Sequence, residues 1–288
     1  MKIRIGTRKS RLALAQTELL INKLKTAFND IETEIVHIST KGDRNLDRPL
    51  SSFGGKGVFI SELEEALLSG EVDLAVHSAK DLPLELAEGL EISAVLERGN
   101  YRDVLVARNN FPIKNSPDFV VGTGSIRRKG FLNKLYPLVT VKDIRGNVDT
   151  RLRKLISGEY DALILAAAGL ERLGIYQSTE YTVTPFEYTE FLPSPCQGII
   201  AIESRINDER LKSCINAINH IKSFYSFRLE RSVPQILNAG CGMPLGAYSE
   251  VQGNKITLYV SCEDCNIIHK SADISESIRL AEELTKKL

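Results

Sequence analysis

The same succession of strand, glycine-rich turn and helix occurs twice in this chain, and this repetition restricts its fold more than any other feature. In the first copy an alternating strand over residues 3–5 is followed by GTRKS at 6–10 and by a helix with apolar residues at helical spacing. In the second copy a strand over residues 119–121 is followed by GTGS at 122–125 and by a helix from about Ile126. The repetition predicts two related α/β units.

A second pattern recurs later in each half. A helix ends at Ser-Gly-Glu-x-Asp and runs into an apolar strand, as SGEVDLAVHS at 69–78 and SGEYDALILA at 157–166. The distance from the Gly-Thr turn to this pattern is 63 residues in the first half and 35 in the second. The first half therefore contains an insertion. Its polar, glycine-rich segment at 41–57 has no helix or strand period and is typical of a lid or a disordered loop.

Two further segments indicate where the chain passes between domains. These are ERGNYRDVLVAR at 97–108 and FLPSPCQGIIAIESR at 191–205, the second of which has prolines that interrupt regular structure. From about Asn219 the pattern changes to a helix, a hairpin with its turn at Gly253-Asn254, and a final helix from about Ser275. We expect an α/β fold with two α/β domains, residues 1–98 with 199–217 and residues 99–198, followed by a small α+β domain over residues 218–288.

Composition excludes several classes of protein. With 288 residues, 43% of them hydrophobic, the chain can bury a large core. No segment approaches the roughly 18 consecutive apolar residues of a membrane span, and the N-terminus alternates like a strand instead of resembling a signal peptide. Five thinly spread cysteines, an odd number, do not suggest a disulfide framework. We expect a cytoplasmic protein with reduced thiols.

Basic charge is concentrated in one window of a chain whose net charge is zero. Residues 123–154 hold nine basic and two acidic side chains. Such a patch on a neutral protein favours a small polyanionic ligand over nucleic acid or a membrane. Arg127 and Arg128 follow a turn of the kind that binds anions, and Arg145 lies in a glycine turn, so their guanidiniums suit carboxylates. Lys134, Arg153 and Lys154 equally fit a solvated helix face.

Candidate acid–base chemistry lies in AVHSAKDLP at 75–83. Ser78, Lys80 and Asp81 follow an apolar strand, at the carboxyl end where ligands meet open α/β sheets. Asp81 beside a lysine is a plausible acid–base group, and it could equally cap a helix that starts near Leu82 or Pro83. His77, among small and apolar residues, is expected to be a hydrogen-bonded core residue.

The cysteines differ in their sequence surroundings. NAGCGMPLG at 238–246 places Cys241 between two glycines, where a thiol would be accessible. Cys262 and Cys265 form a single CxxC at a hairpin turn, without the second pair that a zinc site needs. Cys214 lies in a helical stretch and is expected in the core.

Eight segments together resemble one known family. In chain order they are IGTRKSRLALAQ, FGGKGVF, AVHSAKDLP, GTGSIRR, IRGNVDTRL, LILAAAGLERL, CQGIIAIE and AGCGMPLGAY. Their order along nearly the whole chain resembles the porphobilinogen deaminase family, also called hydroxymethylbilane synthase. No single motif decides the resemblance, but all eight occur in the family's order.

The resemblance implies a three-domain enzyme of tetrapyrrole, porphyrin and heme biosynthesis. Its first two domains would be similar to type II periplasmic binding proteins, with the active site in the cleft between them. A dipyrromethane cofactor would be joined to Cys241 by a thioether, and four porphobilinogen molecules would be condensed head to tail onto it with loss of ammonia. Water would then release the linear tetrapyrrole. The acetate and propionate groups of the pyrrole rings explain the need for several guanidiniums.

The resemblance also assigns residues. Asp81 matches the catalytic aspartate, which would stabilise the azafulvene cation left by ammonia loss and transfer protons. Cofactor and substrate binding would fall to Arg8, Ser10, Lys56, Phe59, Ser78, Lys80, Thr123, Ser125, Arg127, Arg128, Arg145, Gly146, Arg151, Arg172 and Gln197. We expect a monomer with no metal, no nucleic-acid partner and no membrane partner.

Some positions depart from the family pattern, and two other functions remain open. The family commonly has glycine where this chain has Cys196 and serine where it has Gly124, and the CxxC is not a family signature.

The first alternative function is a non-catalytic anion-binding protein of the periplasmic-binding type. The second is a cysteine hydrolase that uses Cys241 with a histidine, although none of the four histidines lies in a recognisable motif.

Overall fold

The computed structural model describes residues 1–40, 60–108, 113–239 and 243–288, which form two compact units. Unit 1 contains Met1–Gly99 and Ile199–Phe227, and unit 2 contains Asn100–Gly198 and Arg228–Leu288. Helix α8 (Ile221–Ile236) crosses this division. The predicted site residues Lys56, Phe59 and Cys241 lie outside the described residues. The division into three domains stays a prediction.

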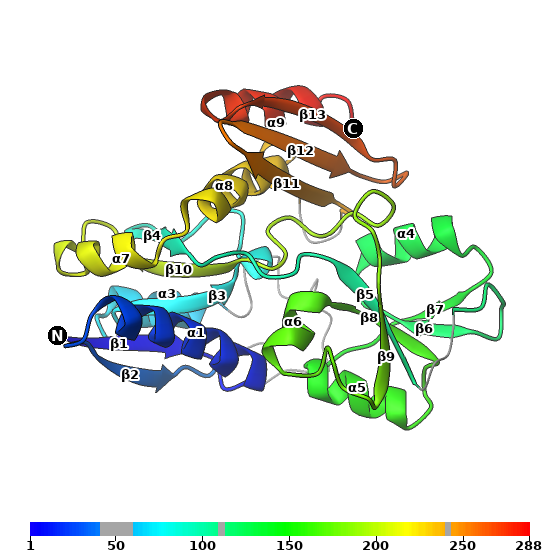
Figure 1. The fold of residues 1–288 in the computed structure, drawn as a ribbon, viewed down its shortest axis with the longest axis horizontal. Helices are drawn as coiled ribbons and strands as arrows, with labels where there is room; N and C mark the ends of the chain where they lie inside the picture. Colours follow the sequence, from blue (N-terminus) through cyan, green and yellow to red (C-terminus); the bar gives the residue numbers. More distant parts are fainter. Residues whose placement is uncertain (41–59, 109–112, 240–242) are drawn as a thin grey trace. The chain divides into compact units, whose positions relative to one another are not determined.

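Unit 1 is built around a five-stranded sheet of order β2-β1-β3-β10-β4 (Figure 1). Its strands are β1 (Lys2–Thr7), β2 (Glu32–His37), β3 (Leu74–Ser78), β4 (Leu90–Val95) and β10 (Ile200–Arg205). Strand β1 is parallel to β2 and β3, and β10 is antiparallel to β3 and β4. The short turn η2 (Ala79–Asp81) follows β3 directly.

Helices cover both faces of this sheet. Helix α1 (Arg11–Ala27) buries Leu20 and Leu24 against Ile3 and Ile5, and α7 (Lys212–Ile218), which follows η3 (Glu209–Leu211), packs on the same face. Helix α3 (Ser61–Leu68) packs on the other face through Leu63 and its neighbours. Apolar side chains at alternating strand positions thus meet helical apolar stripes, as the sequence pattern predicts.

Unit 2 repeats this plan with a sheet of order β7-β6-β8-β5-β9. Its elements are β5 (Asp103–Arg108), β6 (Val120–Gly122), α4 (Ile126–Leu135), β7 (Thr140–Lys142), α5 (Val148–Ile156), β8 (Ala162–Ala166), α6 (Ala167–Arg172) and β9 (Tyr181–Pro185). Strand β6 is parallel to β7 and β8, and β5 is antiparallel to β8 and β9. Because both sheets have the same strand arrangement, the predicted structural repeat is confirmed.

The C-terminal part of unit 2 is a three-stranded antiparallel sheet with one helix. It contains β11 (Gly246–Gln252), β12 (Lys255–Ser261), β13 (Ile268–Asp273), η4 (Ile274–Glu276) and α9 (Ser277–Thr285). The predicted hairpin, final helix and α/β fold class are confirmed. Strand β13 was not predicted, because its sequence IHKSAD is mostly exposed and polar and lacks an apolar alternation.

Aromatic rings join this C-terminal sheet to the larger sheet of unit 2. The rings of Tyr101 and Tyr248 stack with centroids 4.0 Å apart, and Tyr188 lies against both. Burial, the largest influence, raises the pKa of Tyr188, and a hydrogen bond with Tyr259 adds to this effect. Aromatic pairs of this kind stabilise the packed state by more than the burial of their apolar area alone.

Among the described residues, no helix combines the length and apolar character needed to cross a membrane.

A buried carboxylate anchors the edge of unit 1 at which β3 begins. The Asp73 side chain is only 2% exposed and forms ion pairs with Arg4 at 3.0 Å, Arg210 at 2.5 Å and Arg205 at 3.5 Å. Burial opposes ionisation of this carboxyl. Hydrogen bonds from the side chain and backbone of Arg4, together with the charge of Arg210, outweigh that effect and lower its pKa.

We expect Asp73→Asn to lower the free energy of unfolding by about 2 kcal/mol at pH 7, because partly exposed arginines would lose a charged hydrogen-bond acceptor. A lowered pKa in the folded state means that the contribution is complete above the ordinary value of 3.8 and is lost as pH falls through the folded pKa. Urea unfolding at a series of pH values should show the difference between variant and parent shrinking below that value. A difference that does not change with pH would contradict the assignment.

Candidate functional site

In unit 1, the predicted site residues lie at one edge of the sheet. Strands β1 and β3 are parallel neighbours, with Ile5 opposite Leu74, so their carboxyl ends share an edge. Arg8 and Ser10 follow β1, whereas Ser78, Lys80 and Asp81 end or follow β3. The topology therefore brings these five predicted residues to the edge where ligands bind open α/β sheets.

Local contacts orient the backbone at this edge. The Ser10 hydroxyl caps α1 by accepting from the Ala13 N–H at 3.3 Å, and the Gln16 amide donates to Ser78 Oγ at 2.8 Å. The N–H of Ala79 donates to the Ile199 carbonyl at 3.0 Å, which ties η2 to the segment before β10. Sequence reasoning missed Gln16, because a glutamine in an amphipathic helix has no distinguishing pattern.

The Asp81 carboxylate is exposed, and no described residue forms a hydrogen bond or ion pair with it. No helix begins in the described residues 82–89. The alternative that Asp81 caps a helix there is therefore wrong. An unpaired carboxylate beside a lysine at a ligand-binding edge can act on a ligand that brings its own N–H groups.

His77 has the structural role that the sequence predicts. Its side chain is buried in β3, and its Nε2 lies 2.8 Å from Glu203 Oε2 in the neighbouring strand β10. The prediction of a hydrogen-bonded core histidine is confirmed.

In unit 2, two turns meet at the corresponding edge. Strands β6, β7 and β8 are parallel, so the turns after β6 and β7 lie at the same edge. A side chain at Gly124 would place its Cβ 3.1 Å from the Ile144 carbonyl oxygen. The family's serine at this position would therefore require a shift of a few tenths of an ångström. Thr123 is buried, and its Oγ1 accepts from the N–H of Ser125 at 3.2 Å, while the Ser125 hydroxyl caps α4.

The turn after β7 presents Arg145 to solvent. Its neighbour Gly146 has φ +104°, and a Cβ there would lie 2.8 Å from Thr150. Only glycine fits this conformation without strain. Arg151 Nε donates to the Gly146 carbonyl at 2.7 Å, which fixes the turn, whereas no described residue pairs with the exposed Arg145 guanidinium.

Arg127 and Arg128 are buried, although their sequence suggested guanidiniums that face a ligand. Both pair with Asp103, and Arg127 also donates to the Leu192 carbonyl at 2.6 Å. Gln197 is buried as well and donates to Asp103 and to the Tyr101 carbonyl. Their binding of a ligand stays a prediction.

Arg172, at the end of α6, forms no ion pair with a described residue. Its Nη2 donates to the neutral Gly198 carbonyl at 2.6 Å. Burial lowers its pKa to about 10, and the nearby charge of Glu171 only partly opposes this. A half-buried guanidinium is stabilised when an anion pairs with it, so a ligand carboxylate would suit this position.

The chain's departure at Cys196 is explained by the backbone. Cys196 has φ +61°, a left-handed conformation that glycine adopts easily, and its N–H donates to Glu230 Oε2 at 2.7 Å. This accounts for the glycine that the family commonly has at this position.

We expect Cys196→Gly to change the free energy of unfolding by less than about 1 kcal/mol, since relief of strain offsets the lost sulfur contacts. Cys196→Val should cost at least about 2 kcal/mol, because a β-branched residue is strained at this φ. Denaturant unfolding of both variants tests the explanation. Equal stability of the two variants would refute it.

The remaining thiols lie in the described core. Cys262 and Cys265 are buried, and a side chain at Gly130 in α4 would place its Cβ 2.8 Å from Cys265 Sγ, so this glycine leaves room for the sulfur. Lys134 of α4 donates to the Cys265 carbonyl at 2.9 Å, so this lysine binds the CxxC turn. Among the described residues, no cluster of three or more His, Cys, Asp or Glu side chains could hold a metal ion.

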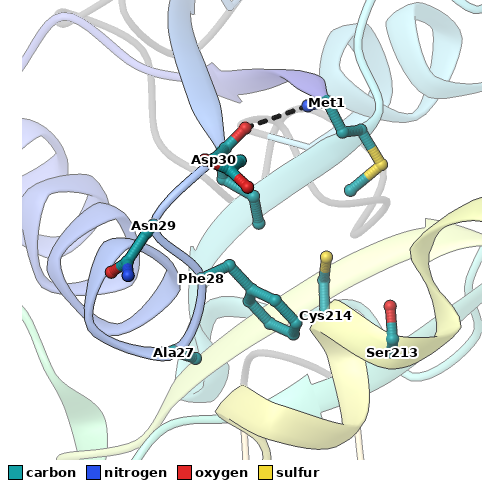
Figure 2. Close-up of a pocket in the computed structure, with 8 residues that line it drawn as sticks. Met1, Ala27, Phe28, Asn29, Asp30, Ser213 and Cys214 are labelled. Carbon is teal, nitrogen blue, oxygen red and sulfur yellow. Dashed lines mark hydrogen bonds between the residues drawn. The ribbon is translucent and has the colours of Figure 1, made fainter.

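Cys214 is buried in α7, as predicted, and lies beside a pocket of about 400 Å³ (Figure 2). Met1, Phe28 and Asp30 also line this pocket, and the Met1 ammonium donates to the Asp30 carbonyl at 3.0 Å. Because Met1 precedes β1, the pocket lies at the amino end of that strand. It is therefore at the opposite end of β1 from Arg8 and Ser10.

Comparison with known proteins identifies the family. A family model described as "Porphobilinogen deaminase, dipyromethane cofactor binding domain" matches residues 3–213, and "Porphobilinogen deaminase, C-terminal domain" matches residues 224–288. The chain belongs to the porphobilinogen deaminase family.

Relatives named porphobilinogen deaminase support this membership. The one from Rickettsia typhi is 46% identical over 249 residues, which are 86% of this chain and 83% of that relative. The one from Oceanobacillus iheyensis is 44% identical over 260 residues, which are 89% and 83% respectively. The Bordetella pertussis BvgS periplasmic VFT2 domain is only 16% identical, with a TM-score of 0.43 over 78% of this chain and 87% of that chain. A likeness this distant carries no conclusion about function.

The described residues fit the dipyrromethane cofactor that gives the porphobilinogen deaminase domain its description. The pyrrole rings of porphyrin biosynthesis carry carboxylate side chains. Arg172 is a half-buried cation and Arg145 an exposed one, and neither forms an ion pair with a described residue. Guanidiniums of this kind suit ligand carboxylates, and their binding of the cofactor stays a prediction.

Proposed function

We propose that this chain is a hydroxymethylbilane synthase. It condenses four porphobilinogen molecules head to tail onto a covalently bound dipyrromethane and releases ammonia and the linear tetrapyrrole. Family membership over residues 3–213 and 224–288 supports this proposal. The structural observation that carries it is that each unit gathers predicted site residues at the carboxyl edge of its parallel strands.

Each predicted residue type has a part in this reaction. Arg8, Arg145 and Arg172 bind ring carboxylates, and the hydroxyls of Thr123 and Ser78 orient neighbouring groups. At each addition a carbon–nitrogen bond breaks, ammonia leaves, and a carbon–carbon bond forms at the carbon that carried the nitrogen. Asp81 stabilises the positive charge that ammonia loss leaves on the substrate ring and accepts a proton as the new bond forms. The bound cofactor supplies the first pyrrole ring to be extended.

Cys241 attaches the cofactor through its sulfur, because a thiolate is a strong nucleophile and two flanking glycines leave room for the rings. The enzyme acts in the cytoplasm as a monomer on a small molecule, without a metal ion, nucleic acid or membrane.

One experiment tests this function against the alternatives. Purified protein is incubated with porphobilinogen, ammonia and hydroxymethylbilane are measured, and the intact mass is recorded. We expect about one ammonia per porphobilinogen consumed and a permanent adduct on the 32.0 kDa chain. A non-catalytic anion-binding protein would release no ammonia, and a cysteine hydrolase would carry no permanent adduct. Either result would overturn the proposal.

A further inference from the structure

Asp103 lies at the edge of unit 2 where the parallel strands end. It is the first residue of β5, and it pairs with Ala166, the last residue of β8. Strand β5 runs antiparallel to β8, so its beginning reaches the same edge as the carboxyl ends of β6 and β8. The Asp103 side chain is fully buried there.

The Asp103 carboxylate orients Arg128. Nε and Nη2 of Arg128 both donate to Asp103 Oδ1, at 3.0 and 2.7 Å, and Nη1 donates to the Ile164 carbonyl at 2.8 Å. Gln197 donates to the same Oδ1 at 3.0 Å. A planar guanidinium held through three nitrogens has little freedom to rotate.

The other carboxylate oxygen forms an ion pair with Arg127. Nη2 of Arg127 lies 2.7 Å from Asp103 Oδ2, and its Nη1 donates to the Leu192 carbonyl. One carboxylate thus fixes the guanidiniums of two consecutive residues, which extend from the first turn of α4 directly after the turn at 123–125.

The charges in this cluster do not balance. Two guanidiniums share one carboxylate, and among the described residues Asp103 is the acid with which Arg127 and Arg128 form ion pairs. The N-terminus of α4 adds further positive potential. Burial lowers the pKa of Arg127, and the charge of Asp103 opposes this effect. Without Asp103, two buried like charges would lie side by side with no counterion.

We propose that Asp103 is a positioning residue for the condensation reaction, which holds Arg127 and Arg128 in the orientation that binds the carboxylates of the growing pyrrole chain. This inference rests on the proposed function. Asp103 itself touches neither substrate nor cofactor, and it acts through the two arginines. The excess positive charge of the cluster is then matched by a ligand carboxylate.

The first test compares Asp103→Asn with Asp73→Asn. Both replace a buried carboxylate that pairs with arginines, but Asp73 lies in unit 1 and has no part in the proposed site. We expect kcat/KM of folded Asp103→Asn to fall at least about 100-fold, because misplaced binding groups cost that much. Asp73→Asn, assayed at a temperature where it is folded, should stay within about twofold of the parent. Equal activities of the two variants would overturn the proposal.

The second test separates KM from kcat, a split that loss of stability alone would not produce. In the proposal Arg127 and Arg128 bind the carboxylates of the pyrrole chain, so misplacing them in Asp103→Asn should raise the KM for porphobilinogen by at least about 10-fold. The KM of Asp73→Asn should equal that of the parent. An unchanged KM in Asp103→Asn would contradict the inference.

A double-mutant cycle keeps the inference testable if Asp103→Asn folds poorly. Asp103→Asn combined with Arg127→Met restores the net charge of the cluster. If Asp103 acts through both arginines, adding Asp103→Asn to Arg127→Met should lower kcat/KM by a clearly smaller factor than in the parent, because only Arg128 remains to be misplaced. Fully multiplicative losses would refute it. Failure of this inference can be told apart from failure of the proposed function, because in the second case the parent protein itself would make no hydroxymethylbilane.

Discussion

Asp81→Ala is expected to abolish turnover while the protein stays folded. The carboxylate is exposed at the carboxyl end of β3 and forms no described hydrogen bond or ion pair, so its removal should change stability by less than about 0.5 kcal/mol. The same carboxylate is expected to stabilise the cation left by ammonia loss and to accept a proton. Losing both contributions should lower kcat by at least about 1,000-fold.

Single-turnover release of ammonia from porphobilinogen is the measurement for this variant. The thermal unfolding curve and the mass of the adduct should match those of the parent, which would show that fold and cofactor are retained. Glu85→Ala is a suitable control, because Glu85 is also an exposed acid four residues along the chain. Its rate should equal that of the parent. Near-normal turnover by Asp81→Ala would mean that another group performs this chemistry.

Cys241→Ser is expected to yield protein without attached pyrrole. A serine hydroxyl is a far weaker nucleophile than a thiolate, so no ether should form in place of the thioether. Purified variant should have the mass of its encoded chain, 32.0 kDa without an adduct, and should give no colour with a pyrrole-specific aldehyde reagent. Hydroxymethylbilane formation should be lost with the adduct.

Cys214→Ser is the matched control for this substitution. Cys214 is buried in α7 beside the pocket at the amino end of β1, so its replacement should leave the adduct in place. If Cys241→Ser keeps the adduct and Cys214→Ser loses it, the attachment site has been assigned to the wrong cysteine.

Much of the fold follows from local sequence patterns. The strand–turn–helix repeat, the hairpin at Gly253-Asn254 and the final helix depend on residue spacing within short windows. The structure has each of them. Strand β13 has no such pattern, because pairing with β12 and not apolar alternation determines it.

The candidate site likewise depends partly on local sequence and partly on tertiary contacts. The sequence by itself determined which residues follow the parallel strands, because strand ends and glycine turns are local features, and it thereby placed Arg8, Asp81 and Arg145. Only the tertiary structure decided which acidic and basic side chains form ion pairs. Asp103 meets Arg128 across 25 residues and Gln197 across 94, and no short window contains such contacts. Burial makes the two arginines that follow the turn at 123–125 a fixed pair on one carboxylate, since a buried charge needs a partner close by.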